Sequence, residues 1–138
     1  MNRVAVRVTS TGKIQNVEQD YIRRVGRAVN ASVAIVRQSA IDLIKRSPKT
    51  GNTYKRGGKI HRASAPGEPP ASDGGKLVAE IYPVIDADKL GGQVESRAPY
   101  SKYLEFGSDG GKIKKRPFLF PALEMNKPRI RAIFARLK

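Results

Sequence analysis

Residues 17–46 read VEQDYIRRVGRAVNASVAIVRQSAIDLIKR, and this stretch decides the fold. Its apolar side chains recur at spacings of three and four, the period of an amphipathic helix. Asn16 can cap the helix with Gln19 at the third position, and Pro48 disfavours helix at Ser47. We therefore predict a helix from about Val17 to Arg46, roughly 45 Å long at 1.5 Å per residue. Its apolar face comprises Val17, Tyr21, Val25, Ala28, Val29, Ser32, Val36, Ala40, Leu43 and Ile44, and its opposite face carries Arg23, Arg24, Arg27, Arg37 and Lys45.

Short strands and helices are predicted on both sides of this helix. Alternation of apolar and polar residues predicts strands at residues 4–8, 77–85 and 93–97, the last two as a hairpin. Pro83 places the second strand at an edge or a bulge. A short helix is expected at 100–106 and a C-terminal helix from about Pro121, kinked or broken at Pro128. Together these elements predict one α+β domain, with the long helix packed on a small, mostly antiparallel sheet.

The stretch from Ser47 to Gly75 predicts a long basic loop or arm. Glycine and proline interrupt it repeatedly, large apolar residues are almost absent, and no acidic residue precedes Glu68. A second lysine-rich loop follows the short helix, before the C-terminal helix. The candidate residues facing DNA or a partner protein are Lys49, Lys55, Arg56, Lys59 and Arg62 in the first loop and Lys112, Lys114, Lys115 and Arg116 in the second.

Composition narrows the function classes. The 138 residues hold 27 Lys and Arg against 12 Asp and Glu, so the net charge is +15 and polyanions are the favoured partners. The chain has no Cys and one His, His61, which leaves no thiolate, Cys-based metal site or catalytic triad. We expect Glu80, Glu95 and Glu105 to be surface charges, and we assign no catalytic residue, metal or cofactor. No apolar run is long enough to span a membrane, so synthesis in the cytoplasm is expected.

Aromatic residues gather near the second basic loop. One set shares the short helix at spacings of three, and Phe118 and Phe120 can return across the loop to meet it. We expect this cluster to be scaffold, with Phe106 and Phe118 buried, and a docking surface as the alternative. Its members are Tyr100, Tyr103, Phe106, Phe118 and Phe120.

Four segments then carry a resemblance. They are APGEPPA at 65–71, GKL at 75–77, APYSKYLEFG at 98–107 and RPFLFPALE at 116–124. With them, the part from about Ser47 to Asn126 resembles the HK97 gp10-like family of tailed-bacteriophage neck and tail-completion proteins. The YLEFG and RPFLFPALE runs are the specific part.

The resemblance implies a non-catalytic subunit of a virion that joins the tail to the DNA-filled head. It further implies a ring, hexameric by preference with twelve-fold symmetry as the alternative. The partners would be other copies, adjacent neck and tail-terminator or tail-tube proteins, and genomic DNA bound without sequence preference. Two other functional classes stay open. A sequence-independent nucleic-acid-binding protein would explain the charge but not the proline-rich and aromatic segments. A small hydrolase or nuclease is the enzyme alternative, and it is disfavoured because this chain has no clustered carboxylates.

Overall fold

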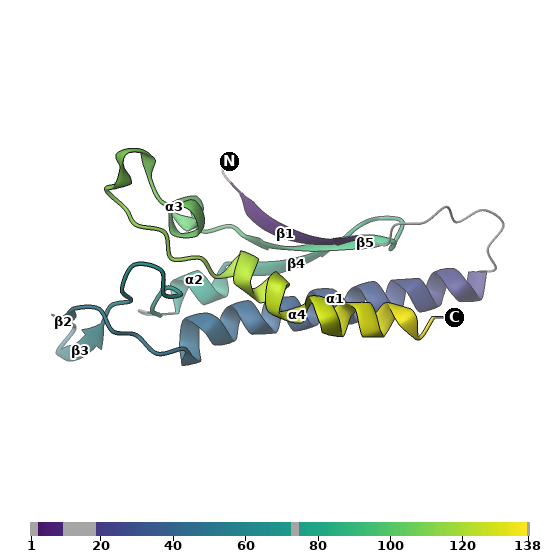
Figure 1. The fold of residues 1–138 in the computed structure, drawn as a ribbon, viewed down its shortest axis with the longest axis horizontal. Helices are drawn as coiled ribbons and strands as arrows, with labels where there is room; N and C mark the ends of the chain where they lie inside the picture. Colours follow the sequence, from purple (N-terminus) through teal and green to yellow (C-terminus); the bar gives the residue numbers. More distant parts are fainter. Residues whose placement is uncertain (1–2, 10–18, 73–74, 138) are drawn as a thin grey trace.

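The computed structural model describes residues 3–9, 19–72 and 75–137. Two helices lie along one face of a small antiparallel sheet, and a hairpin and a loop extend at one end (Figure 1). This is the α+β architecture that the sequence predicts. In chain order the elements are β1 (Val4–Thr9), α1 (Gln19–Arg46), β2 (Thr53–Arg56), β3 (Lys59–Arg62), α2 (Lys76–Ala79), β4 (Ile81–Ile85), β5 (Gly91–Ser96), α3 (Ser101–Phe106), a 3-10 turn (Asp109–Gly111) and α4 (Leu119–Ala135).

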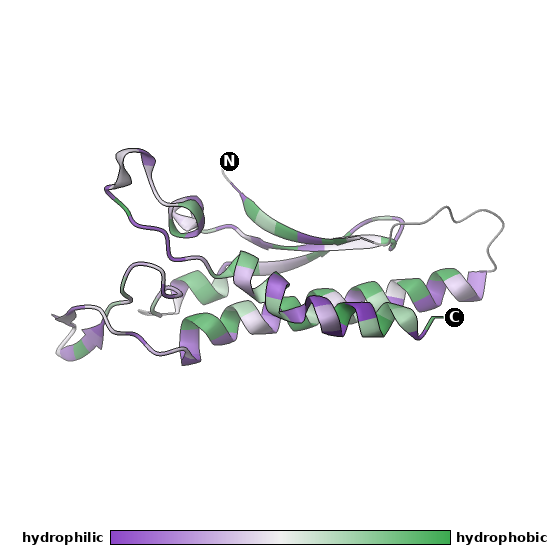
Figure 2. Ribbon diagram, viewed as in Figure 1, coloured by the Kyte–Doolittle hydropathy of each residue, from purple (hydrophilic) through white to green (hydrophobic). Residues whose placement is uncertain are grey.

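Helix α1 supplies half of the core. It ends at Arg46 as predicted, while the expected cap Asn16 and Val17 lie outside the described residues. Its buried face comprises Val25, Gly26, Ala28, Val29, Ser32, Val33, Val36, Ala40, Ile41 and Ile44. These side chains meet Val94 and Ile81 of the sheet and Phe118 and Leu119 at the start of α4. Figure 2 shows the apolar residues concentrated where helices and sheet meet.

The main sheet has three strands in the order β1-β5-β4, all antiparallel. The Asp86 N–H donates to the Gly91 carbonyl at 2.9 Å, and the Arg97 N–H donates to the Glu80 carbonyl at 2.9 Å. Alternate residues of a strand direct their backbone groups to opposite sides, so Pro83 directs its nitrogen away from β5. The prediction of an edge strand is confirmed, because proline removes no hydrogen bond from the ladder there.

Two predicted boundaries are wrong in the middle of the chain. The predicted strand 77–85 begins as the helical turn α2, closed by a hydrogen bond from the Ala79 N–H to the Gly75 carbonyl at 3.0 Å. The strand is therefore limited to Ile81–Ile85. In the helical turn before it, Leu77 is buried and Ala79 is exposed, although the predicted strand placed both on one face. An alternating pattern over so few residues does not separate a strand from one turn of helix. The partner strand begins at Gly91, two residues before the predicted start.

Helix α4 packs beside α1 and crosses Pro128 without ending. The expected break is therefore wrong, although Figure 1 shows a bend between its light-green first turns and its yellow remainder. The buried Asn126 amide donates to Ser39 Oγ at 2.8 Å and to the Ala122 carbonyl at 2.7 Å. This side chain ties α4 to α1 at mid-length. Among the described helices, none is both long and apolar enough to cross a membrane.

Candidate functional site

The first basic loop is a folded hairpin in part, so the prediction of a loop or arm over the whole stretch from Ser47 to Gly75 is corrected. Strands β2 and β3 pair from Thr53 with Arg62 to Arg56 with Lys59. Gly57 and Gly58 lie between them with φ of 58° and 77°. Positive φ at both central residues is the requirement of a two-residue type I′ turn, and glycine meets it without strain. The Gly-Gly pair between residues of high strand propensity is the signal that sequence reasoning missed.

The two faces of the hairpin differ in chemistry. Tyr54 and His61 are directly paired, and their rings stack with centroids 5.6 Å apart. Because side chains alternate along a strand, Arg56 shares this face with Tyr54. The opposite face carries Lys55 with Ile60, whose side chain is 70% exposed. The hairpin thus presents cations on both faces.

Polar contacts hold the segment that follows the hairpin. The Glu68 carboxylate accepts hydrogen bonds from the Thr50 hydroxyl, from the Thr50 N–H at 3.0 Å and from the Ala65 N–H at 2.8 Å. The hydroxyl bond, followed by the backbone bonds, holds the pKa of Glu68 below its usual range. The Gly67 N–H also donates to the Lys115 carbonyl at 3.0 Å. The Glu68 contacts lie within the first basic loop, and the Gly67–Lys115 contact joins it to the second.

Arg116 connects the same two loops. Its guanidinium Nε and one terminal nitrogen each donate to the Ser64 carbonyl at 3.3 Å, and the other terminal nitrogen donates to the Lys114 carbonyl at 3.1 Å. The Arg116 N–H donates to the Leu104 carbonyl of α3. Arg116 is therefore a structural tie as well as a charge.

A hollow of about 490 Å³ lies between the hairpin, α2 and α3, where these contacts hold the two loops together. We call this hollow the basic groove. Its cationic side chains are Arg56, Lys76 and Arg116, and Tyr54 and Tyr100 add two aromatic rings. Among the described residues that line it there is no carboxylate. The arrangement suits a phosphate-bearing polymer, because cations contact the backbone while tyrosine rings stack on bases. The remaining lining residues are Ala63, Ser64, Pro70, Ala71, Leu77 and Leu104.

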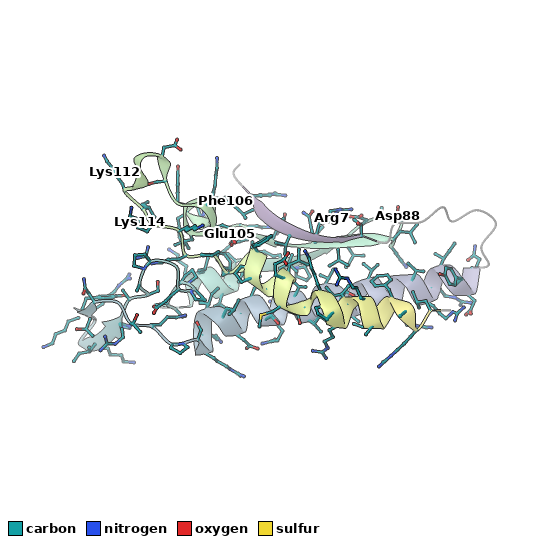
Figure 3. The ribbon with its side chains drawn as sticks, viewed as in Figure 1. Arg7, Asp88, Glu105, Phe106, Lys112 and Lys114 are labelled. Atoms are coloured by element: carbon teal, nitrogen blue, oxygen red, sulfur yellow. The ribbon has the colours of Figure 1, made fainter. Side chains whose placement is uncertain are left out.

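The predicted basic residues gather at this end of the molecule. Lys112 and Lys114 lie on the loop after α3, on the same side as the hairpin (Figure 3). The exposed members are Lys55, Arg56, Lys59, Arg62, Lys112, Lys114 and Lys115. Arg62 donates to the Gly51 carbonyl at 3.1 Å, so it also braces the base of the hairpin.

Lys49 has a different position from its predicted companions. It is half-buried, and its ammonium donates to the Leu43 carbonyl at 2.9 Å and to the Ser47 hydroxyl. Burial lowers the pKa of Lys49, and the nearby Glu68 carboxylate acts in the opposite direction. Lys49 thus caps the carbonyl end of α1, where a cation meets the negative end of the helix dipole.

The aromatic cluster is mostly exposed, which corrects its prediction as scaffold. Phe118 is completely buried, as expected, but Phe106 is 68% exposed and Phe120 is 58% exposed. Tyr100 and Tyr103 are each 42% exposed. Among the described residues the stacked pair is Tyr54 with His61, outside this cluster. Tyr100 and Phe106 line two different hollows, so shared helical spacing neither gathered these rings at one site nor showed which of them are covered.

Glu105 is a buried structural residue that sequence reasoning assigned to the surface. Its carboxylate accepts hydrogen bonds from the N–H groups of Phe118, Leu119 and Phe120 at 2.9–3.1 Å. These are the first groups of α4, which have no partner within the helix. An anion at the positive end of a helix is stabilising, so Glu105 fixes where α4 begins.

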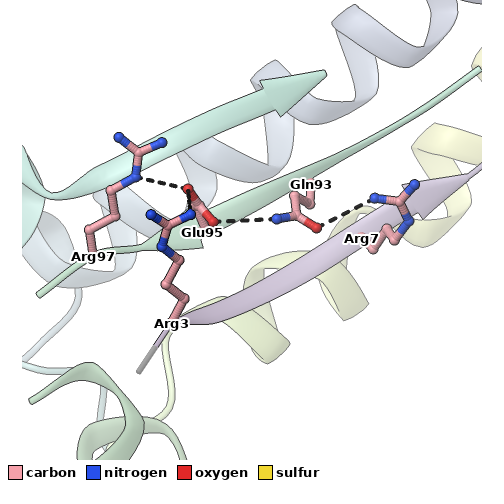
Figure 4. Close-up of polar contacts among 5 residues, drawn as sticks. All are labelled: Arg3, Arg7, Gln93, Glu95 and Arg97. Atoms are coloured by element: carbon pink, nitrogen blue, oxygen red, sulfur yellow. Dashed lines mark hydrogen bonds and ion pairs between the residues drawn. The ribbon is translucent and has the colours of Figure 1, made fainter. Parts of the chain in front are cut away.

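Glu95 is the second buried carboxylate, and it lies on the sheet face opposite the helices. Its neighbours are Arg97 at 2.8 Å, Gln93 at 3.3 Å and Arg3 at 3.9 Å (Figure 4). Arg7 continues the row through Gln93 and pairs with Asp86. The row balances charge across the strands, and Glu95 is not a surface charge as predicted.

Neither of these carboxylates lies in a metal-binding cluster, since the described residues hold no group of three or more potential ligands. Comparisons with protein-family models, with curated proteins and with solved structures found no match.

Proposed function

We propose that this chain is a structural subunit of a tailed-phage virion, a tail-completion or neck protein that joins the tail to the DNA-filled head. In this proposal it acts without catalysis, cofactor or metal, as a ring with hexameric symmetry preferred. Its neighbours are other copies, adjacent neck and tail-terminator or tail-tube proteins, and DNA in the lumen.

The observation that carries the proposal is the contact between the two runs on which the resemblance rests. Glu105, from the YLEFG run, binds the first N–H groups of the RPFLFPALE run. Segments separated by the second basic loop thus form one unit, which explains why both runs occur together. The neighbouring aromatic side chains, Phe106 and Phe120, are left exposed beside it, as contact with a neighbouring protein of the virion needs.

Charge supports contact with DNA or an acidic neighbour. The net charge is +15, and the exposed lysines of both basic loops lie at one end of the molecule (Figure 3). A ring of such subunits concentrates cations around its axis or against the next ring. Polyanions offset that self-repulsion.

The decisive experiment uses the phage that encodes this chain. Without the protein, we expect DNA-filled heads and separate tails in electron micrographs, and addition of the purified protein restores complete particles. Complete particles without the protein contradict the proposal. Accumulation of DNA-free heads with no attached tails indicates packaging instead, and also contradicts it.

A second candidate function is sequence-independent binding of nucleic acid, favoured by the three cations and two tyrosines of the basic groove. Affinity for single-stranded DNA, whose unpaired bases can stack on the tyrosines, should then fall steeply with salt. Replacing Lys112, Lys114 and Lys115 by Ala should lower the slope of that dependence by about 1 to 3.

The matched control for this test replaces Arg27, Lys45 and Arg129 by Ala. All three are exposed on α1 and α4, and the control loses the same three charges. An equal effect in both variants shows that net charge alone governs binding. A sequence-specific footprint contradicts this second function outright.

A further inference from the structure

Strand β1 has a partner on one side only among the described residues. Gly91 and Arg97 form hydrogen bonds toward the β4 side of β5, and so do the odd-numbered residues between them. The backbone groups of Gly92, Val94 and Ser96 therefore face β1. By alternation, Val4, Val6 and Val8 bond to β5, while Ala5, Arg7 and Thr9 point their N–H and C=O groups outward. None of these outward residues is proline. The edge therefore offers a complete row of donors and acceptors.

A groove follows this edge over its whole length, between β1 and α4. One hollow of about 440 Å³ lies along Val4, Ala5 and Val6, and a second of about 270 Å³ lies along Arg7, Val8 and Thr9. We call the two together the β1–α4 groove. Six residues of extended chain span about 20 Å, so one strand fits alongside β1. The other lining residues are Glu105, Phe106, Lys115, Pro117, Leu119 and Phe120 in the first hollow and Leu123, Lys127, Ile130 and Arg131 in the second.

The far wall of the groove has a row of apolar side chains, beside the cations Lys127 and Arg131 of α4. Phe120, Leu123 and Ile130 line it from α4, and Phe120 is 58% exposed. Phe106 adds a second large exposed ring from α3, close to β1 (Figure 3). A strand added to β1 would bury these side chains beneath it, because every second residue of that strand would face α4. The helix layer is thus wider than the sheet that it covers.

The opposite edge of the sheet is closed to the same kind of pairing. Pro83 occupies an outward position of β4 and has no N–H to donate, a common protection of exposed edges. A second copy cannot pair its β4 completely with β1, and pairing through its own β1 brings together two chains of +15 each, which repel one another. These two facts disfavour another copy as the occupant.

The charges of the groove indicate the chemistry of a different partner. Four cations line it, and two of them already have partners: Arg7 pairs with Asp86 and Lys127 pairs with Glu124. The other two, Lys115 and Arg131, have no ion-pair partner among the described residues. Among the described lining residues the one carboxylate is Glu105, and it already accepts hydrogen bonds from N–H groups of α4. An acidic partner therefore complements the groove.

We propose that the β1–α4 groove binds an extended acidic segment of another protein, which adds to the sheet as a fourth strand beside β1. Its apolar residues alternate with acidic ones, so that the apolar residues pack on α4 and the acidic ones point to the opposite face of the sheet, where Arg7 lies. Backbone pairing supplies affinity, and the alternating side chains supply specificity. The inference does not depend on a role in a phage particle.

The test uses a capped peptide of about eight residues in which Glu and Val alternate, titrated into the full chain and followed by amide NMR. We expect the amides of Ala5, Arg7 and Thr9 to shift more than those of Val6 and Val8. A peptide with Lys in place of Glu should not bind. Absence of binding at about 1 mM, or equal binding of both peptides, overturns the proposal.

Two variants locate the binding on the chain. Ala5→Pro removes an outward N–H and leaves the ladder to β5 intact, so it should weaken the peptide by about fivefold or more at an unchanged melting temperature. Phe120→Ser should also weaken it, whereas Met125→Ser, an equally exposed apolar position of α4 outside the groove, should not. Unchanged affinity in Ala5→Pro overturns strand addition. A wild-type dimer that Ala5→Pro dissociates shows that a second copy is the occupant and overturns the proposed partner.

Discussion

The helix–sheet body and the basic end of this molecule are held together in different ways. In the body, formed by α1, α4 and the three-stranded sheet, the completely buried side chains gather and are almost all apolar. In the basic end, formed by the hairpin and the loops at 63–72 and 107–116, the strands are exposed, and individual hydrogen bonds from Glu68 and Arg116 provide the order. Burial thus stabilises one region, while the other keeps its charges in solvent and available to a partner.

Phe118 and Phe120 provide the largest test of this difference, because they are two residues apart and only Phe118 is buried in the core, whereas Phe120 lies in solvent as the side chains of the basic end do. Phe118→Ala should lower the free energy of unfolding by about 3 to 5 kcal/mol, since it empties a site in the core. Phe120→Ala should change it by about 0.5 kcal/mol or less. Urea denaturation of the two variants measures both. Similar losses would mean that the body extends over Phe120.

Glu105 provides an intermediate test, because it is polar and yet belongs to the body. Glu105→Ala leaves three N–H groups of α4 without their acceptor and should cost about 2 to 3 kcal/mol. Glu105→Gln keeps one accepting oxygen and should cost less. Thermal unfolding is the measurement, and Glu124→Ala, an exposed position of α4, is the matched control. If Glu105→Ala melts like that control, the carboxylate does not position α4.

The smallest expected effect is a pH response confined to the basic end. The pKa of Glu68 is lowered in the folded chain, so its contribution is complete above the ordinary value of about 4.5 and is lost as pH falls through the folded value. The amide protons of Thr50 and Ala65 should therefore shift with a midpoint below 4.5, while the body keeps its spectrum. Glu68→Gln should abolish that titration. A midpoint above 4.5 would exclude the hydrogen bonds as its cause.

Much of the body could be predicted from periodicity. The long helix, its buried face and its end at Arg46 follow from the spacing of valines and alanines and from Pro48. The first strand and the edge position of Pro83 follow from alternation and from the missing N–H. The turn α2 and the β2–β3 hairpin could not be predicted in the same way, because a few residues do not establish a period.

Of the candidate site, the sequence predicted only which residues are basic and not what each of them contacts. The basic residues of both loops are evident in the sequence, and most of them are exposed at one end. The individual structural roles are not evident in the sequence. Lys49 caps α1, Arg116 joins the two loops, and Glu105 accepts hydrogen bonds from the first N–H groups of α4. Each of these tasks depends on a partner that lies far along the chain or in another element.

The sequence by itself determined the α+β class, the charge of +15, the lack of thiol chemistry and the amphipathic character of the main helix. Those properties depend on residue type and on local spacing, which every chain carries in its order. The tertiary structure alone decided which aromatic side chains are covered, which glutamates are buried, and that β1 is an edge strand beside α4 in the sheet formed by the described residues. Burial and pairing depend on which distant segments meet in space, and local spacing does not record that.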